Sequence, residues 1–464
     1  MRPVATPEEM AAIDAAAPEP VEVLVQRAGA SVADAAVALL GGADGRRVLV
    51  VAGKGSNGAD GRVCAERLRA LGAQVEVLDA AAAPERLPDA DLVVDAAYGT
   101  GLGRPYGAPA TDAPVLAVDL PSGLDGLTGC PLGRPVTATR TVTFAALKPG
   151  HLLGAGPDHC GEVDVVDIGL DASGVAAHLV DPADIAGLVP PRPREDHKWR
   201  SACWVVAGSP GMEGAAHLAA RAAQRSGAGY VRLSVPGGGT EAAPLEVVVD
   251  PVPADLTPPE DHQRFAALVL GPGLGPVAAA DVRALLGAFT GPAVVDGDGL
   301  TALGLVEAPL RPTPTVLTPH DGEFERLTGS RPGPDRLAAA RALAATSGAV
   351  VLLKGPTTVV ASPDGRVRLA ASGDQRLATA GSGDVLAGIV GAFLARGADA
   401  LYAAAAGAHV HGRLLDSLAP TGAVAGDLAP RLVETLVALG VDRPLGVGAL
   451  CAPPGLPSTW RPLR

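Results

Sequence analysis

The sequence predicts an α/β protein of two domains, each built on a parallel β-sheet that helices cover on both faces. The chain of 464 residues is too long for one ordinary domain, and each half is long enough to bury a core. Its composition is 48% hydrophobic but only 3% aromatic, with 60 glycines, which suits closely packed α/β layers and phosphate-binding loops. Short apolar strands also alternate with helical stretches in two separate series, a pattern typical of parallel sheets.

The first series runs from residue 46 to residue 170. A buried strand at 46–53 leads into a glycine-rich turn, a helix over about 60–71 and a second strand at 74–78. Further strands are expected at 91–99, 113–123 and 162–170. Ligands of open α/β sheets bind at the carboxyl ends of the strands, so we expect the ligand-binding loops of this domain at that edge.

A charged, proline-rich segment at 182–196 separates the two series and predicts a linker between domains. The second series has a helix over about 214–226 and strands expected at 203–211, 230–237, 267–275, 293–300, 315–323, 349–360 and 366–373. We therefore predict domains at 1–185 and 186–451, followed by a C-terminal tail at 452–464.

Charge and cysteine content exclude several classes of protein. The net charge is −13 and no basic stripe occurs, so nucleic acid is not an expected partner. The five cysteines lie far apart without a CxxC pair, which indicates reduced thiols rather than a disulfide or metal framework. Residues 1–10 lack the features of a signal peptide, and the longest apolar run, 385–395, is too short to span a bilayer. We expect a soluble, cytoplasmic protein without a membrane partner.

A glycine-rich motif, GKGSNGADG at 53–61, follows the first strand and opens a helix. Its GxGxxG match at Gly53, Gly55 and Gly58 predicts a dinucleotide site in a Rossmann-like three-layer α/β sandwich. A tight structural turn would give the same short match, so the motif alone leaves both interpretations open. Two more loops at the carboxyl ends of strands, at 94–105 and 118–126, favour a ligand site.

These loops carry a resemblance to a known family. GKGSNGADG, DAAYGTGLG and VDLPSG resemble the NAD(P)H-hydrate epimerase domain, an isomerase that interconverts the R and S epimers of hydrated NADH and NADPH. The resemblance covers about residues 1–185 and implies that Asp119 is catalytic. It implies that the hydrate binds Ser56, Asn57, Gly58, Ala59, Asp60, Gly99, Thr100, Gly101, Leu102, Gly103, Arg104, Pro105 and Asp119. It also implies that oxygen atoms of Asn57, Asp95 and Ser122 ligate a potassium ion.

The motif departs from the family's usual GNNGGDG at Ser56 and Ala59. Serine keeps a hydrogen-bonding group, but a methyl group at Ala59 is tolerable only where φ is negative. Weak or lost epimerisation therefore stays open. For Asp95 and Asp119 the alternative role is that of strand-end acids that cap the following loops.

In the second half, Gly381, Ser382 and Gly383 stand directly before Asp384 and an apolar helix. Small residues at a helix start let free N–H groups approach an anion, and a carboxylate at the edge of such a cradle can serve as an acid or base. A capped helix start without a ligand is the alternative. KGPTT at 354–358 follows a strand and is a plausible nucleotide loop.

These segments carry the second resemblance. The stretch 206–231, with GPGLG, DGDG, TPHDGEF, KGPTT and AGSGD, resembles the ADP- or ATP-dependent (S)-NAD(P)H-hydrate dehydratase, a lyase of the ribokinase-like superfamily, over about 188–450. It implies a ribokinase-like α/β domain with hydrate-binding residues Ala215, Gly273, Gly275, His320 and Asp384. The implied nucleotide-binding residues are Lys354, Gly355, Pro356, Thr357, Thr358, Gly381, Ser382 and Gly383. One departure is HDGE at 320–323, where many members have HPGE.

This resemblance gives the anion cradle a role. Dehydration must expel hydroxide, a poor leaving group, and phosphorylation of the hydroxyl converts it into phosphate, which leaves readily. The amides of Gly381 to Gly383 would hold the terminal phosphate of ADP or ATP, bound with Mg²⁺, while Asp384 takes the proton of the attacking hydroxyl. Elimination of phosphate then restores NAD(P)H.

The sequence thus predicts a bifunctional metabolite-repair enzyme whose partners are small molecules, hydrated NADH or NADPH and ADP or ATP. A vitamin-type kinase of the same superfamily and a nucleotide-sensing protein with a silent first site are the alternatives. His409 and His411 are expected to be structural. The choice between ADP and ATP, and self-association of the chain, are left open.

Overall fold

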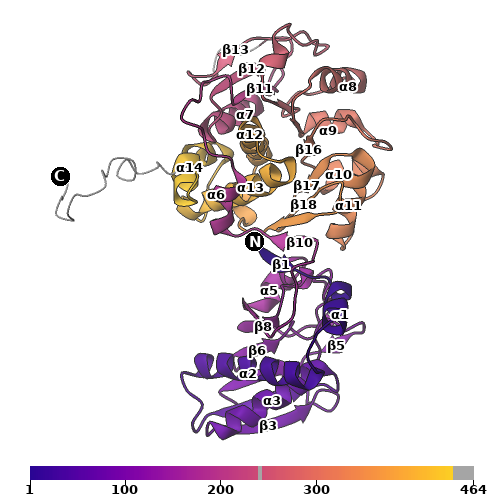
Figure 1. The fold of residues 1–464 in the computed structure, drawn as a ribbon, viewed down its shortest axis with the longest axis vertical. Helices are drawn as coiled ribbons and strands as arrows, with labels where there is room; N and C mark the ends of the chain where they lie inside the picture. The colour runs from indigo at the N-terminus through magenta and orange to yellow at the C-terminus, as the bar shows by residue number, and fades with distance from the viewer. Residues whose placement is uncertain (239–242, 443–464) are drawn as a thin grey trace, which may run out of the picture.

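The computed structural model describes residues 1–238 and 243–442, which form two α/β units joined along the long axis of the molecule (Figure 1). The N-terminus lies at the junction between the units, beside β1 and β10. The predicted C-terminal tail, 452–464, lies outside the described residues.

The first unit contains a six-stranded parallel sheet in the order β3-β2-β4-β6-β8-β9. Its strands are β2 (Arg47–Ala52), β3 (Gln74–Asp79), β4 (Leu92–Ala96), β6 (Val115–Val118), β8 (Arg140–Phe144) and β9 (Glu162–Val166). The sequence pattern did not predict β8, because Thr141 and Thr143 interrupt its apolar run. Both threonines are buried, and the Thr141 hydroxyl donates to the Cys160 carbonyl at 2.7 Å. A hydrogen-bonded hydroxyl can therefore stand inside a sheet at a position where the sequence analysis expected an apolar residue.

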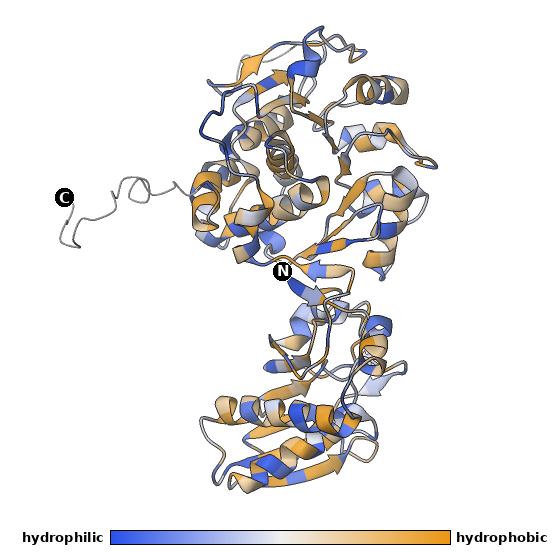
Figure 2. Ribbon diagram, viewed as in Figure 1, coloured by the Kyte–Doolittle hydropathy of each residue, from blue (hydrophilic) through white to orange (hydrophobic). Residues whose placement is uncertain are grey.

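The helices of the first unit are α1 (Pro7–Ala15), α2 (Val21–Leu40), α3 (Ser56–Ala70), α4 (Pro149–Leu152) and α5 (Gly156–Cys160). Helices α2 and α3 pack on one face of the sheet, against Val48, Val50 and Leu92. Loops and the two short strands β5 (Tyr106–Gly107) and β7 (Gly133–Arg134) lie near the opposite face, whose Leu49 and Val51 pack with Tyr106. Figure 2 shows hydrophobic residues along the strands of this sheet.

Helix α2 is a second apolar segment that the sequence analysis did not consider. By length and composition alone it is long and apolar enough to cross a membrane. In the structure its residues Ala28, Val32 and Ala36 are buried in the core cluster under the sheet, as in a core helix.

The second unit contains an eleven-stranded sheet in the order β1-β10-β19-β18-β17-β16-β15-β14-β11-β12-β13. Its strands are β1 (Arg2–Val4), β10 (Ala177–Leu179), β11 (Ala202–Val206), β12 (Tyr230–Ser234), β13 (Val248–Val249), β14 (Ala267–Leu270), β15 (Ala293–Val295), β16 (Thr315–Leu317), β17 (Val350–Leu353), β18 (Thr358–Ala361) and β19 (Val367–Ala370). Strands β11 to β17 form a parallel block, and β17, β18 and β19 are antiparallel neighbours. The predicted strands of the second series are present, except that 349–360 is not one strand. Strands β17 and β18 run antiparallel there and are joined by residues 354–357.

Helices cover both faces of this sheet. On one side α7 (Glu213–Arg225), α12 (Ser382–Ala395), α13 (Ala400–Arg413) and α14 (Ala425–Ala438) share one core cluster. On the other side lie α8 (Ala279–Ala288), α9 (Asp298–Leu303), α10 (Asp321–Thr328) and α11 (Arg336–Ser347). The short helices η2 (His262–Arg264), η3 (Gln375–Leu377) and η4 (Leu414–Ser417) lie in connections. The predicted two-domain α/β class is confirmed.

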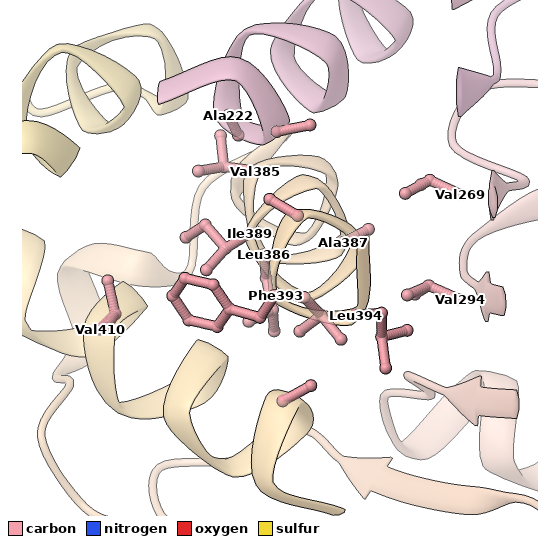
Figure 3. Close-up of a cluster of buried hydrophobic side chains, with 14 of the residues drawn as sticks. Ala222, Val269, Val294, Val385, Leu386, Ala387, Ile389, Phe393, Leu394 and Val410 are labelled. Carbon is pink, nitrogen blue, oxygen red and sulfur yellow. The ribbon is translucent and has the colours of Figure 1, made fainter. Parts of the chain in front are cut away.

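Helix α12 is the central helix of the second unit, and Figure 3 shows it surrounded by apolar side chains. All but two of its residues are buried, because its sequence is apolar on every side. A Cβ atom on Gly388 would lie 2.2 Å from the Ala219 carbonyl oxygen of α7, and one on Gly391 would lie 2.2 Å from Val269 of β14. These glycines allow the close packing that fixes the N-terminus of α12 above the sheet.

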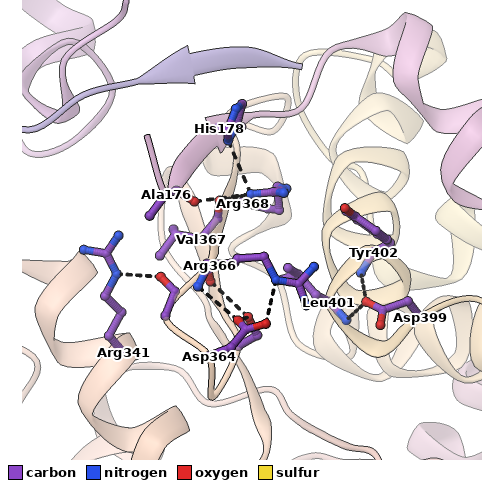
Figure 4. Close-up of polar contacts among 12 residues, drawn as sticks. Ala176, His178, Arg341, Asp364, Arg366, Val367, Arg368, Asp399, Leu401 and Tyr402 are labelled. Atoms are coloured by element: carbon purple, nitrogen blue, oxygen red, sulfur yellow. Dashed lines mark hydrogen bonds and ion pairs between the residues drawn. The ribbon is translucent and has the colours of Figure 1, made fainter. Parts of the chain in front are cut away.

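The N-terminal strand joins the sheet of the second unit. Strand β1 pairs antiparallel with β10, which in turn lies parallel to β19. Figure 4 shows this seam, where Arg368 of β19 contacts His178 of β10 and the Ala176 carbonyl. The sequence analysis predicted neither β1 nor β10, because Pro3 and His178 interrupt these three-residue strands and neither is an apolar run. The domain boundary between 185 and 186 stays a prediction.

The predicted linker at 182–196 is partly folded. Residues Pro182–Asp184 form the short helix η1 and Ile185–Leu188 form α6, and Ile185 and Val189 are buried in the core of the second unit. The prediction of a linker was wrong for this first part. Its prolines indicated an unfolded segment, although Ile185 and Val189 pack into the core.

Candidate active sites

The first unit holds a cavity of about 790 Å³ at the carboxyl ends of its strands. The predicted residues that line it are Ser56, Asn57, Asp60, Gly99, Thr100, Gly101, Leu102, Gly103, Arg104 and Asp119. Gly58, Ala59 and Pro105 belong to the same two loops but are not among the lining residues. The cavity is also lined by Met10, Asp14 and Lys148, which the sequence analysis did not assign to a site. Lys148 had one visible signal, because the chain contains only four lysines.

The glycine motif brings three backbone segments together. A Cβ atom on Gly53 would lie 1.9 Å from the Ala97 carbonyl oxygen, and one on Gly58 would lie 1.9 Å from the Gly53 carbonyl oxygen. These two glycines are therefore required for the turn before α3. Ala59 lies inside α3 and has negative φ, so its methyl group causes no backbone strain.

Asp119 is the most strongly held carboxylate of this cavity. Its φ is +66°, an unusual backbone conformation for a residue other than glycine, and such strain is common at functional sites. Its carboxylate lies 2.7 Å from the buried ammonium of Lys148 and accepts from the Thr100 N–H at 3.2 Å. Burial acts to raise the pKa of Asp119, but Lys148, His151 and the Thr100 N–H together outweigh burial, and the pKa falls to about 2. Asp119 is therefore ionised.

Asp60 faces the same cavity in the opposite protonation state. Burial, followed by the negative charges of Asp119 and Asp14, raises the pKa of Asp60 to about 8. The cavity thus contains one carboxylate that is ionised and one that is protonated at neutral pH. Pairs of acids with pKa values driven apart are typical of acid–base catalysis.

Of the three predicted potassium ligands, Asn57 lines the cavity, whereas Asp95 and Ser122 are not among its lining residues. The Ser122 N–H and hydroxyl both donate to Asp95, at 2.8 and 2.7 Å, and Asp95 is buried. Burial raises the pKa of Asp95 to about 6. The amide oxygen and nitrogen of Asn57 are buried and have no hydrogen-bond partner among the described residues. A buried amide without a partner can bind a ligand such as a monovalent cation.

The second unit holds a larger cavity of about 1430 Å³. It is lined by ten of the predicted site residues: His320, Lys354, Gly355, Pro356, Thr357, Thr358, Gly381, Ser382, Gly383 and Asp384. Ala215, Gly273 and Gly275 do not line it, although they lie together: a Cβ atom on Gly273 would lie 2.8 Å from the Ala215 Cβ. The Gly275 N–H donates to Asp298 at 2.8 Å, and the charge of Asp298 acts on Asp384.

The side-chain ammonium of Lys354 lies at the start of α12. The Lys354 ammonium is 2.6 Å from the Asp296 carboxylate and 3.8 Å from that of Glu323. A Cβ atom on Gly383 would lie 3.2 Å from the Lys354 ammonium. Burial opposes its charge, yet Asp296 and Glu323 raise the pKa of Lys354. Asp296, which the sequence analysis did not assign, is the first residue of the DGDG segment that it quoted.

Asp384 is placed to act as a base at this helix start. Burial, followed by the charge of Asp296, raises the pKa of Asp384 to about 7. A base with a pKa near the working pH accepts and releases protons efficiently. Ser382 lies 3.1 Å from His411, whose pKa burial lowers to about 4, so a neutral His411 positions the Ser382 hydroxyl.

The HDGE segment keeps its turn without proline. The ring Nδ1 of His320 accepts from the backbone N–H groups of Gly322 at 3.0 Å and of Glu323 at 3.3 Å. The Glu323 carboxylate accepts from the backbone N–H of His320 at 2.8 Å, which closes a capping box at the start of α10. Asp321, at the place of the missing proline, forms an ion pair with Arg336 at 2.9 Å.

Comparisons with known proteins agree with both halves of this description. The model of the NAD(P)H-hydrate dehydratase family matches residues 203–438, and the model of the YjeF-related protein N-terminus matches residues 21–86 and 79–150. A bifunctional NAD(P)H-hydrate repair enzyme Nnr of Mycobacterium tuberculosis is 40% identical over 79% of this chain and 82% of its own length. An Nnr of Salinibacter ruber is 35% identical over 85% of this chain and 88% of its own length.

A solved structure resembles the second unit. The ADP/ATP-dependent NAD(P)H-hydrate dehydratase from Bacillus subtilis, co-crystallised with ATP and Mg²⁺, is 28% identical, with a TM-score of 0.50, over 56% of this chain and 97% of its own. This similarity agrees with a ribokinase-like α/β domain. The dehydratase family model matches half of the chain, and relatives that are 35–40% identical align over more than four fifths of their own length. The chain therefore belongs to the family of bifunctional NAD(P)H-hydrate repair enzymes.

Proposed function

We propose that the chain epimerises the R and S forms of hydrated NADH and NADPH in the cavity of the first unit. It then dehydrates the S form in the second unit, with ADP or ATP as phosphoryl donor. The observation that carries the second activity is the position of Asp384. It stands beside the Gly381–Gly383 cradle and the Lys354 cation, in a cavity large enough for a nucleotide. The relatives give no reason to prefer the alternative of a vitamin-type kinase.

The proposed epimerisation uses acid–base chemistry at the carbon that carries the hydroxyl. That carbon is bonded to the ring nitrogen, so protonation of the hydroxyl allows the C–O bond to break and water to leave, while the nitrogen lone pair forms an iminium bond. Asp60 donates this proton and Asp119 removes a proton from water that adds to the opposite face. The net result is inversion without a change in the atoms of the substrate.

This division of roles predicts a pH dependence for the epimerase. Asp60 acts in its protonated form, and its pKa is raised to about 8, so kcat/KM for epimerisation is expected to fall as pH rises through about 8. Asp14, Asp119 and Lys148 also face the cavity, and Asp119 stays ionised over this range. The rate is measured by chromatography of the two epimers after subtraction of the spontaneous rate. A rate that keeps rising beyond pH 9 would contradict the role of Asp60.

The proposed potassium site comprises Asn57, Asp95 and Ser122, where carboxylate, amide and hydroxyl oxygens fit a monovalent cation. A bound cation would compensate the buried charge of Asp95 and orient the loops around the hydrate. After a thallium soak, an anomalous signal is expected between these three side chains. Crystals in saturating thallium without such a signal would count against the assignment.

The proposed dehydration begins with transfer of the terminal phosphoryl group to the substrate hydroxyl. The backbone amides of Gly381–Gly383 and the Lys354 ammonium balance the charge of the phosphate, and Asp384 accepts the hydroxyl proton. The carboxylates of Asp296 and Glu323 beside the cradle fit a Mg²⁺ ion bound together with the nucleotide, and this ion would neutralise phosphate charge. The C–O bond to phosphate then breaks, the neighbouring ring carbon loses a proton to water, and the C=C bond of NAD(P)H is restored.

The direct test of the whole proposal is an absorbance assay of NADH formation from its hydrate. We expect NADH to form only when ADP or ATP and Mg²⁺ are present, and a mixture of both epimers to be consumed completely. The preferred nucleotide follows from the same assay run with each one. If no NADH forms with either nucleotide, the proposed dehydratase activity is wrong.

We also propose that the protein acts in the cytoplasm and that its domains divide at 185/186. Reduced cysteines fit that compartment, and Cys64, Cys160 and Cys203 are free and buried. Whether identical chains associate is a separate question for sedimentation measurements.

A further inference from the structure

The cavity of the second unit is not formed by the second unit alone. Along one side it is lined by Leu147, His151, Leu152, Pro157 and Val163 of the first unit. These residues belong to α4, α5 and the segments next to them, and they are distant in sequence from every nucleotide-binding motif. The side that carries the cradle, Lys354 and Asp384 comes from the second unit.

The sheet topology brings a second segment to the same cavity. Strand β10 lies parallel to β19, so residues that follow the two strands leave the sheet at the same edge. Val180 and Asp181 follow β10, Ser372 and Gly373 follow β19, and all four line the cavity. At its rim the guanidinium of Arg2 pairs with the carboxylate of Asp181 at 3.0 Å.

A hydrogen bond ties the nucleotide loop to the first unit. The Thr357 hydroxyl donates to the Leu152 carbonyl at 2.6 Å, and Thr357 is only 5% exposed. The hydrogen of this hydroxyl is therefore already used, and the Thr357 side chain can contact the nucleotide only as an acceptor. The contact also fixes α4 beside the KGPTT loop.

The two ends of the cavity differ in chemistry. The Lys354 end is charged and suits phosphate, whereas Leu147, Leu152 and Val163 offer an apolar surface that suits a ring and a ribose. His409 of α13 lines the cavity and is 3% exposed, and neither of its ring nitrogens has a hydrogen-bond partner among the described residues. Burial lowers the pKa of His409, so its ring is neutral. One ring nitrogen can then donate a hydrogen bond to a base or sugar, and the other can accept one.

We propose that the first unit forms one wall of the nucleotide site, and that the nucleoside part of ADP or ATP lies between this wall and His409. This inference rests on the proposed function, because it assumes that the nucleotide phosphates occupy the cradle. It gives the first unit a second role, in nucleotide binding, that is independent of epimerisation.

The test uses the full chain with Leu152→Ala, which removes apolar contact but keeps the carbonyl that Thr357 needs. We expect the KM for ADP or ATP to rise about three- to tenfold with kcat unchanged, since burial of part of a leucine corresponds to that change. The inhibition constant of AMP is expected to rise equally, and that of pyrophosphate, which has no nucleoside, to change less than twofold. Leu40→Ala, at a half-buried leucine of α2 away from both cavities, is the matched control and is expected to leave all values unchanged.

Two substitutions of opposite charge at the exposed Pro157 distinguish an effect on nucleotide binding from a folding defect. Pro157→Glu is expected to raise the nucleotide KM by repulsion and Pro157→Lys to lower it, each about two- to fivefold, whereas a merely structural wall would respond alike to both. Equal responses, or a KM unaffected by Leu152→Ala, would overturn the inference while the wild-type protein still forms NADH. If the wild-type protein forms no NADH with either nucleotide, the proposed function itself fails and the inference falls with it.

Discussion

Asp384→Asn is expected to lower the turnover of dehydration by about two to four orders of magnitude while nucleotide binding survives. The amide keeps the size and the hydrogen-bonding capacity of the side chain, but it cannot accept the proton of the attacking hydroxyl. Burial and Asp296 raise the pKa of Asp384 to about 7, so the wild-type carboxylate is well suited to this transfer at neutral pH. NADH formation gives the turnover, and calorimetric titration with ADP and ATP gives the binding.

Asp281→Asn is the matched control for this experiment. Asp281 lies in the first turn of α8, outside both cavities, and its substitution is expected to leave turnover within a factor of two. Near-normal dehydration by Asp384→Asn would rule out the proposed base and leave Asp384 as a first-turn carboxylate that complements the helix dipole.

Asp119→Asn is expected to abolish epimerisation without abolishing dehydration. With a mixture of epimers and nucleotide, this variant should remove the S form rapidly and leave the R form to decay at its slow spontaneous rate. The epimerase rate is expected to fall by at least about two orders of magnitude, because the ionised carboxylate is proposed to activate water. Chromatography of the two epimers over time measures both reactions in one sample.

The paired variants separate the two sites. Asp384→Asn should show the reverse pattern, in which the epimers equilibrate quickly and no NADH returns, since effects at such separate sites are additive. Asp119→Asn also removes the negative charge that pairs with the buried ammonium of Lys148, so a loss of stability is expected. Dehydration of the S form in the same sample reports whether the chain is folded. If Asp119→Asn clears the R form as fast as the wild type, Asp119 is only a loop cap or another group is the base.

Most of the fold was accessible to sequence analysis because long apolar strands alternate with glycine-rich loops. The short elements were missed for a physical reason. Strands β1 and β10 contain Pro3 and His178 instead of an apolar run, and they form because they extend an existing sheet. Strand β8 was hidden by two threonines whose hydroxyl groups are hydrogen-bonded inside the structure.

Some residues of the two sites could be identified from sequence motifs, and others could not. Motifs identified Asp119, Lys354 and the Gly381–Asp384 segment, because their loops need small residues and a fixed spacing at the ends of strands. Asp14, Lys148 and Asp296 carry comparable electrostatic weight, yet no local pattern marks them as partners of those residues.

The sequence by itself determined the two α/β domains, the family resemblance and the loops that carry the chemistry, since these depend on local spacing and hydrophobic pattern. Only the tertiary structure decided the protonation states of Asp60 and Asp119. It also decided the position of the Lys354 ammonium beside Gly383 and the contact of α4 with the KGPTT loop. These properties arise from burial and from charges that meet across long sequence separations. Leu152 and Thr357 are separated by 205 positions in the sequence, so no local pattern predicts their hydrogen bond, which exists only once both units are folded and in contact.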